Sequence, residues 1–268
     1  MTNILKSVSL CVLTLLPAAF ASAGTLSAPA SVAAQAPAEF LGAPRPCLCL
    51  GSYTGSTEAP FSVNLTAGYD STFFCRGMDM GDDLWSATAT VDWTINENLV
   101  WTVSNRYLNV DETNFEENQL YTGLFYKAGI LSIGPSFRWY HNFNGGMMED
   151  AYDLGLQAVV KAGPVNISGG YYYETETEGQ YFEMGLAAPI RITDRFSLVP
   201  AAEISYTDGW MMPGMKGWNT VTLRLSAPIK LTNVLTLIPW VGANLPLEAL
   251  DAHQDDKFVG GVALSATF

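Results

Sequence analysis

The sequence predicts an all-β protein: a transmembrane, antiparallel, up-and-down β-barrel of twelve strands, preceded by an N-terminal signal peptide and a disordered leader. Three observations lead to this prediction. Apolar and polar residues alternate over most of the chain after residue 60, charged residues are scarce, and short turns alternate with longer connections. A barrel in lipid needs this pattern, because one face of every strand meets hydrocarbon and the other meets the lumen.

Composition fits such a barrel better than a soluble domain. The 268 residues are 49% hydrophobic and 12% aromatic but only 15% charged, whereas soluble proteins carry roughly a quarter of charged residues. After the first twenty residues there is no apolar run of the length that a membrane helix needs. The net charge of −13 argues against a nucleic-acid partner, whose phosphates need a basic surface.

The N-terminus has the features of a secretory signal. Lys6 precedes a mostly apolar stretch, and Ala21-Ser22-Ala23 is an A-x-A cleavage site, so we assign residues 1–23 to a signal peptide. Residues 24–60 are rich in Ala, Pro, Ser and Gly and are expected to form a flexible periplasmic leader. Three cysteines remain after cleavage, an odd number that cannot pair fully within one chain, and the sequence leaves their roles open: Cys47, Cys49 and Cys75.

The barrel is predicted over residues 61–268. The second strand is the clearest: apolar residues from Trp85 to Ile95 alternate with Ser, Thr and Asp, and aromatic residues lie near both ends, where interfacial girdles belong. Alternation places the strands at about 61–70, 85–95, 99–108, 118–127, 130–141, 151–162, 165–174, 180–190, 196–206, 218–229, 234–245 and 258–268.

In the last strand, Phe258, Val262, Leu264 and Phe268 share one parity. A terminal aromatic residue on such a strand resembles the signature by which bacterial outer-membrane barrels are recognised for assembly. Phe268 is therefore expected to contact the barrel-assembly machinery, and the bacterial outer membrane is the expected location.

The connections support the barrel independently of alternation. Those after the even-numbered strands are short, such as Ala128-Gly129 and Gly163-Pro164, whereas those after the odd-numbered strands are mostly longer and acidic. This order matches periplasmic turns and extracellular loops. The acidic residues are expected to be solvated. Alternatively, divalent cations could bridge them to lipopolysaccharide, which with the outer-membrane lipids is an expected partner.

A hairpin unit is repeated near the C-terminal end. Ala188-Pro189-Ile190-Arg191 recurs as Ala227-Pro228-Ile229-Lys230, and the Val199-Pro200 pair recurs as Ile238-Pro239, each displaced by 39 residues (228 − 189 and 239 − 200). Such repeats suggest growth by hairpin duplication. The prolines inside the strands, including Pro135, predict shared bulges or bends, because proline removes a ladder hydrogen bond.

The run Gly68-Tyr69-Asp70-Ser71-Thr72-Phe73-Phe74-Cys75-Arg76-Gly77-Met78 opens the barrel, and the alternation continues to Ser104-Asn105. This opening resembles the putative-porin family called TorF, whose first strand carries a Ser/Asp–Tyr–aromatic–Arg–Gly stretch before a polar loop. Phe74, Arg76 and Gly77 carry the resemblance, with Cys75 as an unusual intervening residue. The resemblance implies an outer-membrane barrel with a presumed pore, and it implies no catalytic residues.

If the apolar parity faces lipid, the charged residues of the other parity face the lumen. A charge facing hydrocarbon at mid-depth would cost about 2–4 kcal/mol for Arg or Lys, so inward placement is the physical default. Three basic members, Arg106, Lys127 and Arg138, lie on the third to fifth strands, and three acidic ones lie on the seventh to ninth. These opposed walls would create a transverse field. The predicted lining residues are Asp92, Arg106, Lys127, Arg138, Asp153, Glu174, Glu183, Glu203 and Arg224, together with Lys161.

These features predict a porin-like channel for passive diffusion of small solutes through a charged lumen. The alternative is a closed structural or adhesive barrel whose lumen is filled by salt bridges, since a twelve-stranded barrel is intermediate in bore. The loop Trp210-Met211-Met212-Pro213-Gly214-Met215 is apolar enough to fold inward as a constriction or to touch a ligand. Met-rich surfaces can bind soft metals, but no Cys or His converges on this loop, so no metal or cofactor is expected.

An enzyme is not expected. The two histidines, His141 and His253, lie near strand ends or loops, and neither a G-x-S-x-G nor an H-E-x-x-H motif is present. A rim histidine with an acidic neighbour could in principle activate water or a serine, but no matching nucleophile motif accompanies either residue. We therefore assign no catalytic residues.

Overall fold

The computed structural model describes residues 60–144, 150–210 and 212–268, all within one compact unit, Ala34–Phe268. The predicted signal peptide, nearly all of the predicted leader, and Met147, Met148 and Met211 lie outside the described residues. The strands are β1 (Phe61–Cys75), β2 (Met78–Asn96), β3 (Leu99–Val110), β4 (Phe115–Ala128), β5 (Leu131–Asn142), β6 (Asp150–Ala162), β7 (Val165–Glu174), β8 (Gln180–Ala187), β9 (Ile190–Arg191), β10 (Ser197–Asp208), β11 (Lys216–Ser226), β12 (Ile229–Lys230), β13 (Leu235–Pro246) and β14 (Lys257–Thr267).

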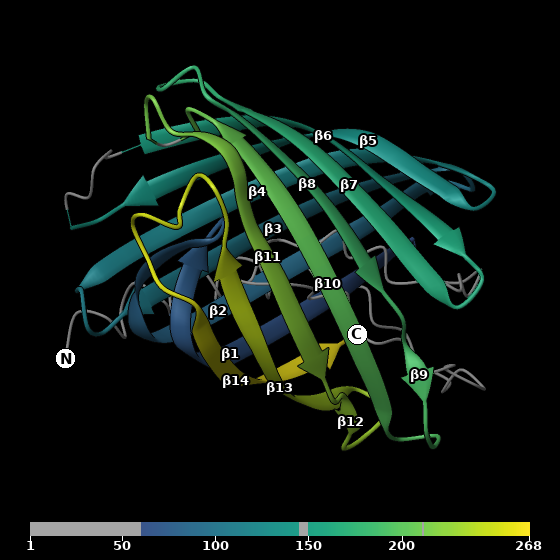
Figure 1. Ribbon diagram of the computed structural model, residues 1–268. Helices are drawn as coiled ribbons and strands as arrows, with labels where there is room; N and C mark the ends of the chain where they lie inside the picture. The colour runs from purple at the N-terminus through teal and green to yellow at the C-terminus, as the bar shows by residue number, and fades with distance from the viewer. Residues whose placement is uncertain (1–59, 145–149, 211) are drawn as a thin grey trace. The chain divides into compact units, whose positions relative to one another are not determined.

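Twelve of these strands form a closed antiparallel barrel (Figure 1). Neighbours in sequence pair from β1 through to β8, then β8 with β10, β10 with β11, β11 with β13 and β13 with β14. Pairing of β14 with β1 closes the ring, with Ala67 opposite Leu264. The two-residue strands β9 and β12 only extend the hairpins to which they belong. The predicted fold class is therefore confirmed.

Burial alternates along the barrel wall as the sequence predicts. On β3, Thr102, Ser104 and Arg106 share one parity and are buried. Trp101, of the other parity, is 40% exposed. Aromatic residues gather near both ends of the outer face: Trp93 packs on Trp101 at 6.1 Å between ring centroids, and Tyr69 packs on Trp85 at 5.0 Å. This is the arrangement of two interfacial girdles around an apolar band.

Within the described part of the chain, no helix is long and apolar enough to cross a membrane.

The first hairpin differs from the prediction. The sequence predicted that the first strand ends near residue 70 and that an acidic loop follows, with Asp79, Asp82 and Asp83 between strands. Instead, β1 continues to Cys75, β2 begins at Met78, and these acidic residues lie within β2. Within the hairpin, Asp82 is held by Thr72 on the facing strand, whose Oγ1 donates a 2.7 Å hydrogen bond to the Asp82 carboxylate.

The repeated hairpins are equivalent in structure as well as in sequence. Ala188 donates its backbone N–H to the carbonyl of Pro200 at 3.0 Å, and Ala227 donates in the same way to Pro239 at 2.9 Å. The proline after each alanine has no N–H, so the strand breaks there, which separates β8 from β9 and β11 from β12. The predicted continuous strands 180–190 and 218–229 are therefore each interrupted at this proline.

Candidate functional site: a hairpin across the lumen

The β1–β2 hairpin crosses the inside of the barrel from one wall to the other. In the ring order β1, β2, β3, β4, β5, β6, β7, β8, β10, β11, β13, β14, strand β7 is six positions from β1 and β8 is six positions from β2. Arg76, at the hairpin tip, contacts Tyr172 on β7 and Tyr181 on β8. A contact between diametrically opposite strands requires the hairpin to span the lumen.

Burial at the tip agrees with this placement. All residues from Thr72 to Met78 are buried, without the alternation seen in the wall strands. A wall strand exposes every second side chain to lipid, whereas a hairpin inside the lumen is covered on both faces. Cys75 is accordingly a buried free thiol.

The tip is a two-residue turn with an unusual backbone. Arg76 and Gly77 have φ angles of 49° and 88°, and a turn with positive φ at both central residues is the type I′ that suits hairpin twist. Positive φ is disfavoured for arginine, so the surroundings must hold Arg76 in place. Gly77 is required for a second reason: a Cβ there would lie 2.5 Å from Cγ2 of Thr220 on β11.

A cage of three aromatic rings and one carboxylate encloses the Arg76 side chain. The guanidinium carbon lies 4.1 Å from the ring centroid of Trp210, 4.2 Å from that of Tyr172 and 4.8 Å from that of Tyr181. Its Nη2 donates to Oδ2 of Asp153 on β6 at 2.5 Å, and the two side chains are only 3% and 1% exposed. The pair is thus a desolvated ion pair strengthened by cation–π contacts.

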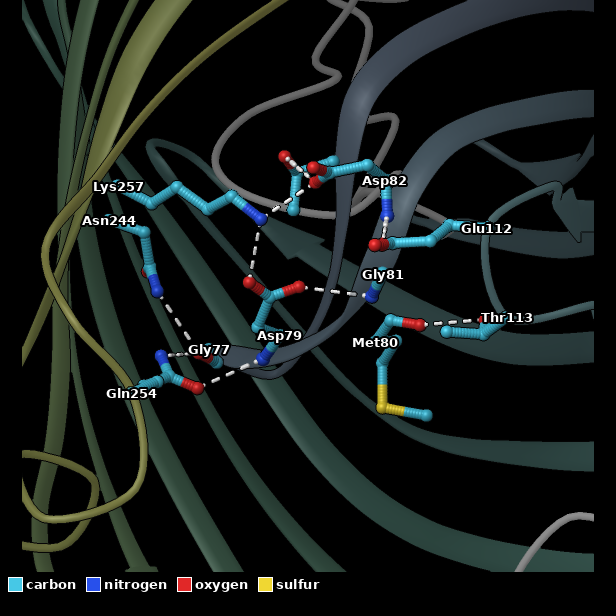
Figure 2. A network of polar contacts seen from close by, with 11 residues as sticks. Gly77, Asp79, Met80, Gly81, Asp82, Glu112, Thr113, Asn244, Gln254 and Lys257 are labelled. Carbon is cyan, nitrogen blue, oxygen red and sulfur yellow. Dashed lines mark hydrogen bonds and ion pairs between the residues drawn. The ribbon is translucent and has the colours of Figure 1, made fainter.

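Amide side chains from β11, β13 and the loop after β13 hold the turn backbone. Asn219 on β11 donates to the carbonyl of Arg76 at 2.5 Å, and Asn244 on β13 donates to the carbonyl of Gly77 at 3.0 Å. Gln254, in the loop after β13, donates to the same Gly77 carbonyl at 2.6 Å and accepts from the N–H of Asp79 at 2.9 Å (Figure 2). These bonds satisfy backbone groups that would otherwise be buried without partners.

Ion pairs and hydrogen bonds hold the β2 side of the hairpin in place. Lys257 of β14 reaches Asp79 at 2.8 Å and Asp82 at 2.6 Å, and Figure 2 shows its ammonium between the two carboxylates. On the other side, the N–H of Asp82 donates to Glu112 at 2.8 Å and Thr113 donates to the carbonyl of Met80 at 3.0 Å. The predicted acidic loop residues therefore act here as hairpin contacts.

Apolar residues close the space around the tip. The cluster joins the hairpin to five further strands and to the loops after β10 and β13, and Met80, Phe115, Met212 and Met215 pack against it. Trp210 is 2% exposed, so the Trp210–Met215 loop, predicted to fold inward or to touch a ligand, places its first residue inside. The buried members are Phe73, Cys75, Met78, Leu84, Leu108, Val110, Tyr140, Ala151, Tyr172, Tyr181, Trp210 and Leu250.

The predicted lining residues differ in burial. Five are buried: Arg106, Arg138, Asp153, Glu174 and Glu203. Four are half-buried: Asp92, Lys127, Glu183 and Arg224. Lys161, near the end of β6, is exposed. Arg106 on β3 and Glu203 on β10 occupy opposite positions in the ring, six strands apart, as a transverse field requires, but the hairpin lies between these walls, with Phe73 at 5.8 Å from the Arg106 guanidinium. The lining role of the set remains a prediction.

Besides Asp153, Glu174 and Asp92 have evident structural partners. Glu174 accepts the backbone N–H groups of Glu176 at 2.8 Å and Thr177 at 2.7 Å, and so shapes the loop after β7. Asp92 accepts the hydroxyl of Thr102 at 2.5 Å across the β2–β3 pair. Carboxylates used in this way stabilise the barrel whether or not a solute passes.

The sequence did not lead us to predict that Arg76 lies in the lumen. It entered only as one of the residues that carry the family resemblance. The available signal was a run, Phe73 to Met78, that is apolar on both sides of an Arg-Gly pair and lacks the period of a wall strand. An apolar run without period-2 alternation indicates a strand covered on both faces.

Comparison with solved structures supports the fold. The chain is similar to the COG4313 outer-membrane channel of Pseudomonas putida F1, with 11% identity, 78% of this chain and 95% of that chain covered, and a TM-score of 0.52. It is also similar to the NanC porin (10% identity, 76% and 98% covered, TM-score 0.51) and to the translocator domain of the Neisseria meningitidis autotransporter NalP (14%, 81% and 91%, 0.50).

No family model matches the sequence, and no curated protein matches it. The solved structures nevertheless show that the chain has the fold of bacterial outer-membrane barrels, and the outer membrane is the compartment to which that fold belongs. At these identities the likeness concerns the fold alone, because the same architecture serves a channel, a porin and a translocator domain.

Proposed function

We propose that the protein is an outer-membrane channel for small solutes, with the β1–β2 hairpin as its internal constriction. The observation that carries the proposal is the hairpin that spans a closed barrel whose inward parity carries charged side chains on opposing walls. The names of two structural neighbours, a channel and a porin, support it. We propose that small solutes pass beside the hairpin or when it is displaced, and that the predicted lining residues select among them.

A closed structural or adhesive barrel is the second candidate. The apolar cluster around the tip favours it, since apolar side chains exclude water and ions from the path they fill. The two candidates differ in one measurable respect, which is whether the barrel conducts with its hairpin tip in place.

The decisive variant replaces residues 73–81 with Asn-Gly. Thr72 and Asp82 are opposite each other across the β1–β2 pair, so a two-residue type I′ turn joins them without changing the wall. In planar bilayers we expect small or infrequent single-channel steps from the wild type and larger, sustained steps from this variant. If the folded wild type gives no steps, whether or not the variant conducts, the channel proposal is wrong and the closed barrel stands.

Family membership and partners extend this proposal. Phe74, Arg76 and Gly77, which carry the resemblance to TorF-type porins, are the hairpin tip itself, so we propose that such an opening motif encodes an inserted hairpin. We further propose that outer-membrane lipids and lipopolysaccharide surround the barrel and that Phe268, a residue that is 68% exposed, contacts the assembly machinery.

A further inference from the structure

We propose that Tyr172, Tyr181, Trp210 and Asp153 form a binding site for organic cations of the guanidinium class, and that Arg76 is its built-in occupant, which such a ligand displaces. We call these four residues the cation cage. The proposal concerns binding and displacement and does not require conduction, so it can fail while the proposed channel function holds, and the reverse.

The cation cage is distinct from the other arginine contacts in the barrel. Three rings lie within 4.8 Å of the Arg76 guanidinium carbon. Among the described residues, the ring of Trp240 lies at 4.1 Å from the Arg224 guanidinium, and the rings near Arg138 are at 5.5 and 5.7 Å. Several rings around one cation, completed by a carboxylate, are the usual features of sites that recognise organic cations.

The walls of the cation cage are held together by contacts that do not involve Arg76. Trp210 donates its indole N–H to Oδ1 of Asp153 at 3.0 Å, and Tyr140 donates its hydroxyl to Oδ2 at 2.7 Å. Tyr181 packs on Trp210 at 5.7 Å and on Tyr172 at 6.4 Å between ring centroids. Because these residues come from β5 to β8 and the loop after β10, removing the Arg76 side chain leaves a preorganised site.

The charge at the cage selects a cation. Asp153 is 1% exposed, and it would lose its ion-pair partner if the hairpin withdrew. Tyr172 also donates its hydroxyl to Glu183 at 2.9 Å, which places a second carboxylate beside the same ring. A planar guanidinium satisfies the rings by stacking and the carboxylate by a charged hydrogen bond, which a neutral or anionic solute cannot do.

Arg76 occupies the cation cage in an unfavourable conformation that a free ligand would not need. Arg76 has a φ of 49°, a left-handed backbone conformation that residues other than glycine and asparagine seldom adopt. Its buried Nη1 has no hydrogen-bond partner in the described structure. A small alkylguanidinium can orient all its donors freely. Competition between ligand and Arg76 therefore follows from the chemistry of the cage.

The binding test uses ethylguanidinium and its neutral isostere ethylurea. Calorimetry on the refolded full barrel in detergent should show ethylguanidinium binding to Arg76→Ala at least tenfold more tightly than to the wild type, and no binding of ethylurea. Arg224→Ala, which removes the arginine from the ring of Trp240, is the matched control and should bind at least tenfold more weakly than Arg76→Ala. Adding Asp153→Asn to Arg76→Ala should abolish binding.

The displacement test uses the wild-type hairpin and needs no folding-sensitive variant. With Cys47 and Cys49 replaced by serine, Cys75 is the reporter thiol, and it is buried at the tip. Millimolar ethylguanidinium should raise the rate of Cys75 labelling by a maleimide at least threefold, whereas equal ethylurea should not. If labelling does not change, or if folded Arg76→Ala binds ethylguanidinium no better than Arg224→Ala does, the proposal is overturned.

Discussion

Asp153→Asn should release the β1–β2 hairpin from the opposite wall. Asp153 accepts hydrogen bonds from Arg76, Tyr140 and Trp210. Asparagine keeps the shape and one carbonyl oxygen but removes the negative charge. Arg76, which remains protonated at any physiological pH, would then be buried without its ion-pair partner in the docked state only, because it regains water when the hairpin withdraws.

The size of the effect follows from burial. Removing one partner of a buried ion pair typically costs about 3–5 kcal/mol, and we take the lower end, about 3 kcal/mol, because the three rings of the cage still stabilise the guanidinium. At 1.4 kcal/mol for each factor of ten, the equilibrium between docked and withdrawn hairpin should shift about a hundredfold toward withdrawal. The barrel wall, with its own hydrogen-bonded strands, should stay folded.

The assay is the labelling rate of Cys75, with Cys47 and Cys49 replaced by serine. If the hairpin opens and recloses faster than the thiol reacts, the rate reports the withdrawn population directly, so Asp153→Asn should raise it about a hundredfold. The control is Asp194→Asn, which breaks an Arg–Asp pair whose side chains are 53% and 91% exposed. That change should leave the rate within about twofold, because an exposed pair contributes little.

A rise of less than threefold in a correctly folded Asp153→Asn barrel would refute this reasoning. It would mean either that Cys75 becomes accessible by another route or that the ion pair does not hold the tip. Circular dichroism and the heat-dependent shift of the barrel in gels establish folding separately, so a global loss of structure cannot be mistaken for release.

Three further predictions concern other parts of the barrel. Gly77→Ala should raise Cys75 labelling at least tenfold, because both its φ of 88° and the approach of Thr220 forbid a Cβ, whereas Gly129→Ala, with a φ of 61° but open space around it, should not. Arg106→Glu should shift the reversal potential in a salt gradient toward cation selectivity; an unchanged potential in a conducting barrel would exclude it from the solute path. Val241→Arg, at a lipid-facing site that is 60% exposed near the middle of β13, should lower the free energy of unfolding in lipid vesicles by about 2–4 kcal/mol, and a loss under 1 kcal/mol would place that site outside the hydrocarbon.

The barrel wall could be predicted because lipid imposes a simple rule on it. Every wall strand must present apolar residues to hydrocarbon at every second position, and this is visible without knowing which strands pair. The prediction 165–174 coincides with β7, and most other strand ends agree within about three residues. Where the wall deviates, at Pro189 and Pro228, the missing N–H explains the break.

The hairpin could not be predicted because its partners are remote in sequence. Asp79 and Asp82 resemble loop residues until Lys257 is placed beside them, 178 and 175 residues later. Arg76 resembles a turn residue until Asp153 and Trp210 close around it, 77 and 134 residues (210 − 76) later. Alternation indicates which side of a strand faces inward, but it does not indicate which residues fill the interior.

Whether the protein acts as a channel or as a closed barrel depends on one quantity, the free energy of withdrawing the hairpin. A gap of about 4 kcal/mol would leave the hairpin withdrawn about 0.1% of the time, rare enough to look closed in bulk flux and frequent enough to appear as brief single-channel steps. Each broken contact at the tip should lengthen those steps, in the order of its effect on Cys75 labelling. If labelling and open time failed to rank Asp153→Asn and Gly77→Ala alike, the hairpin would not be the element that limits passage.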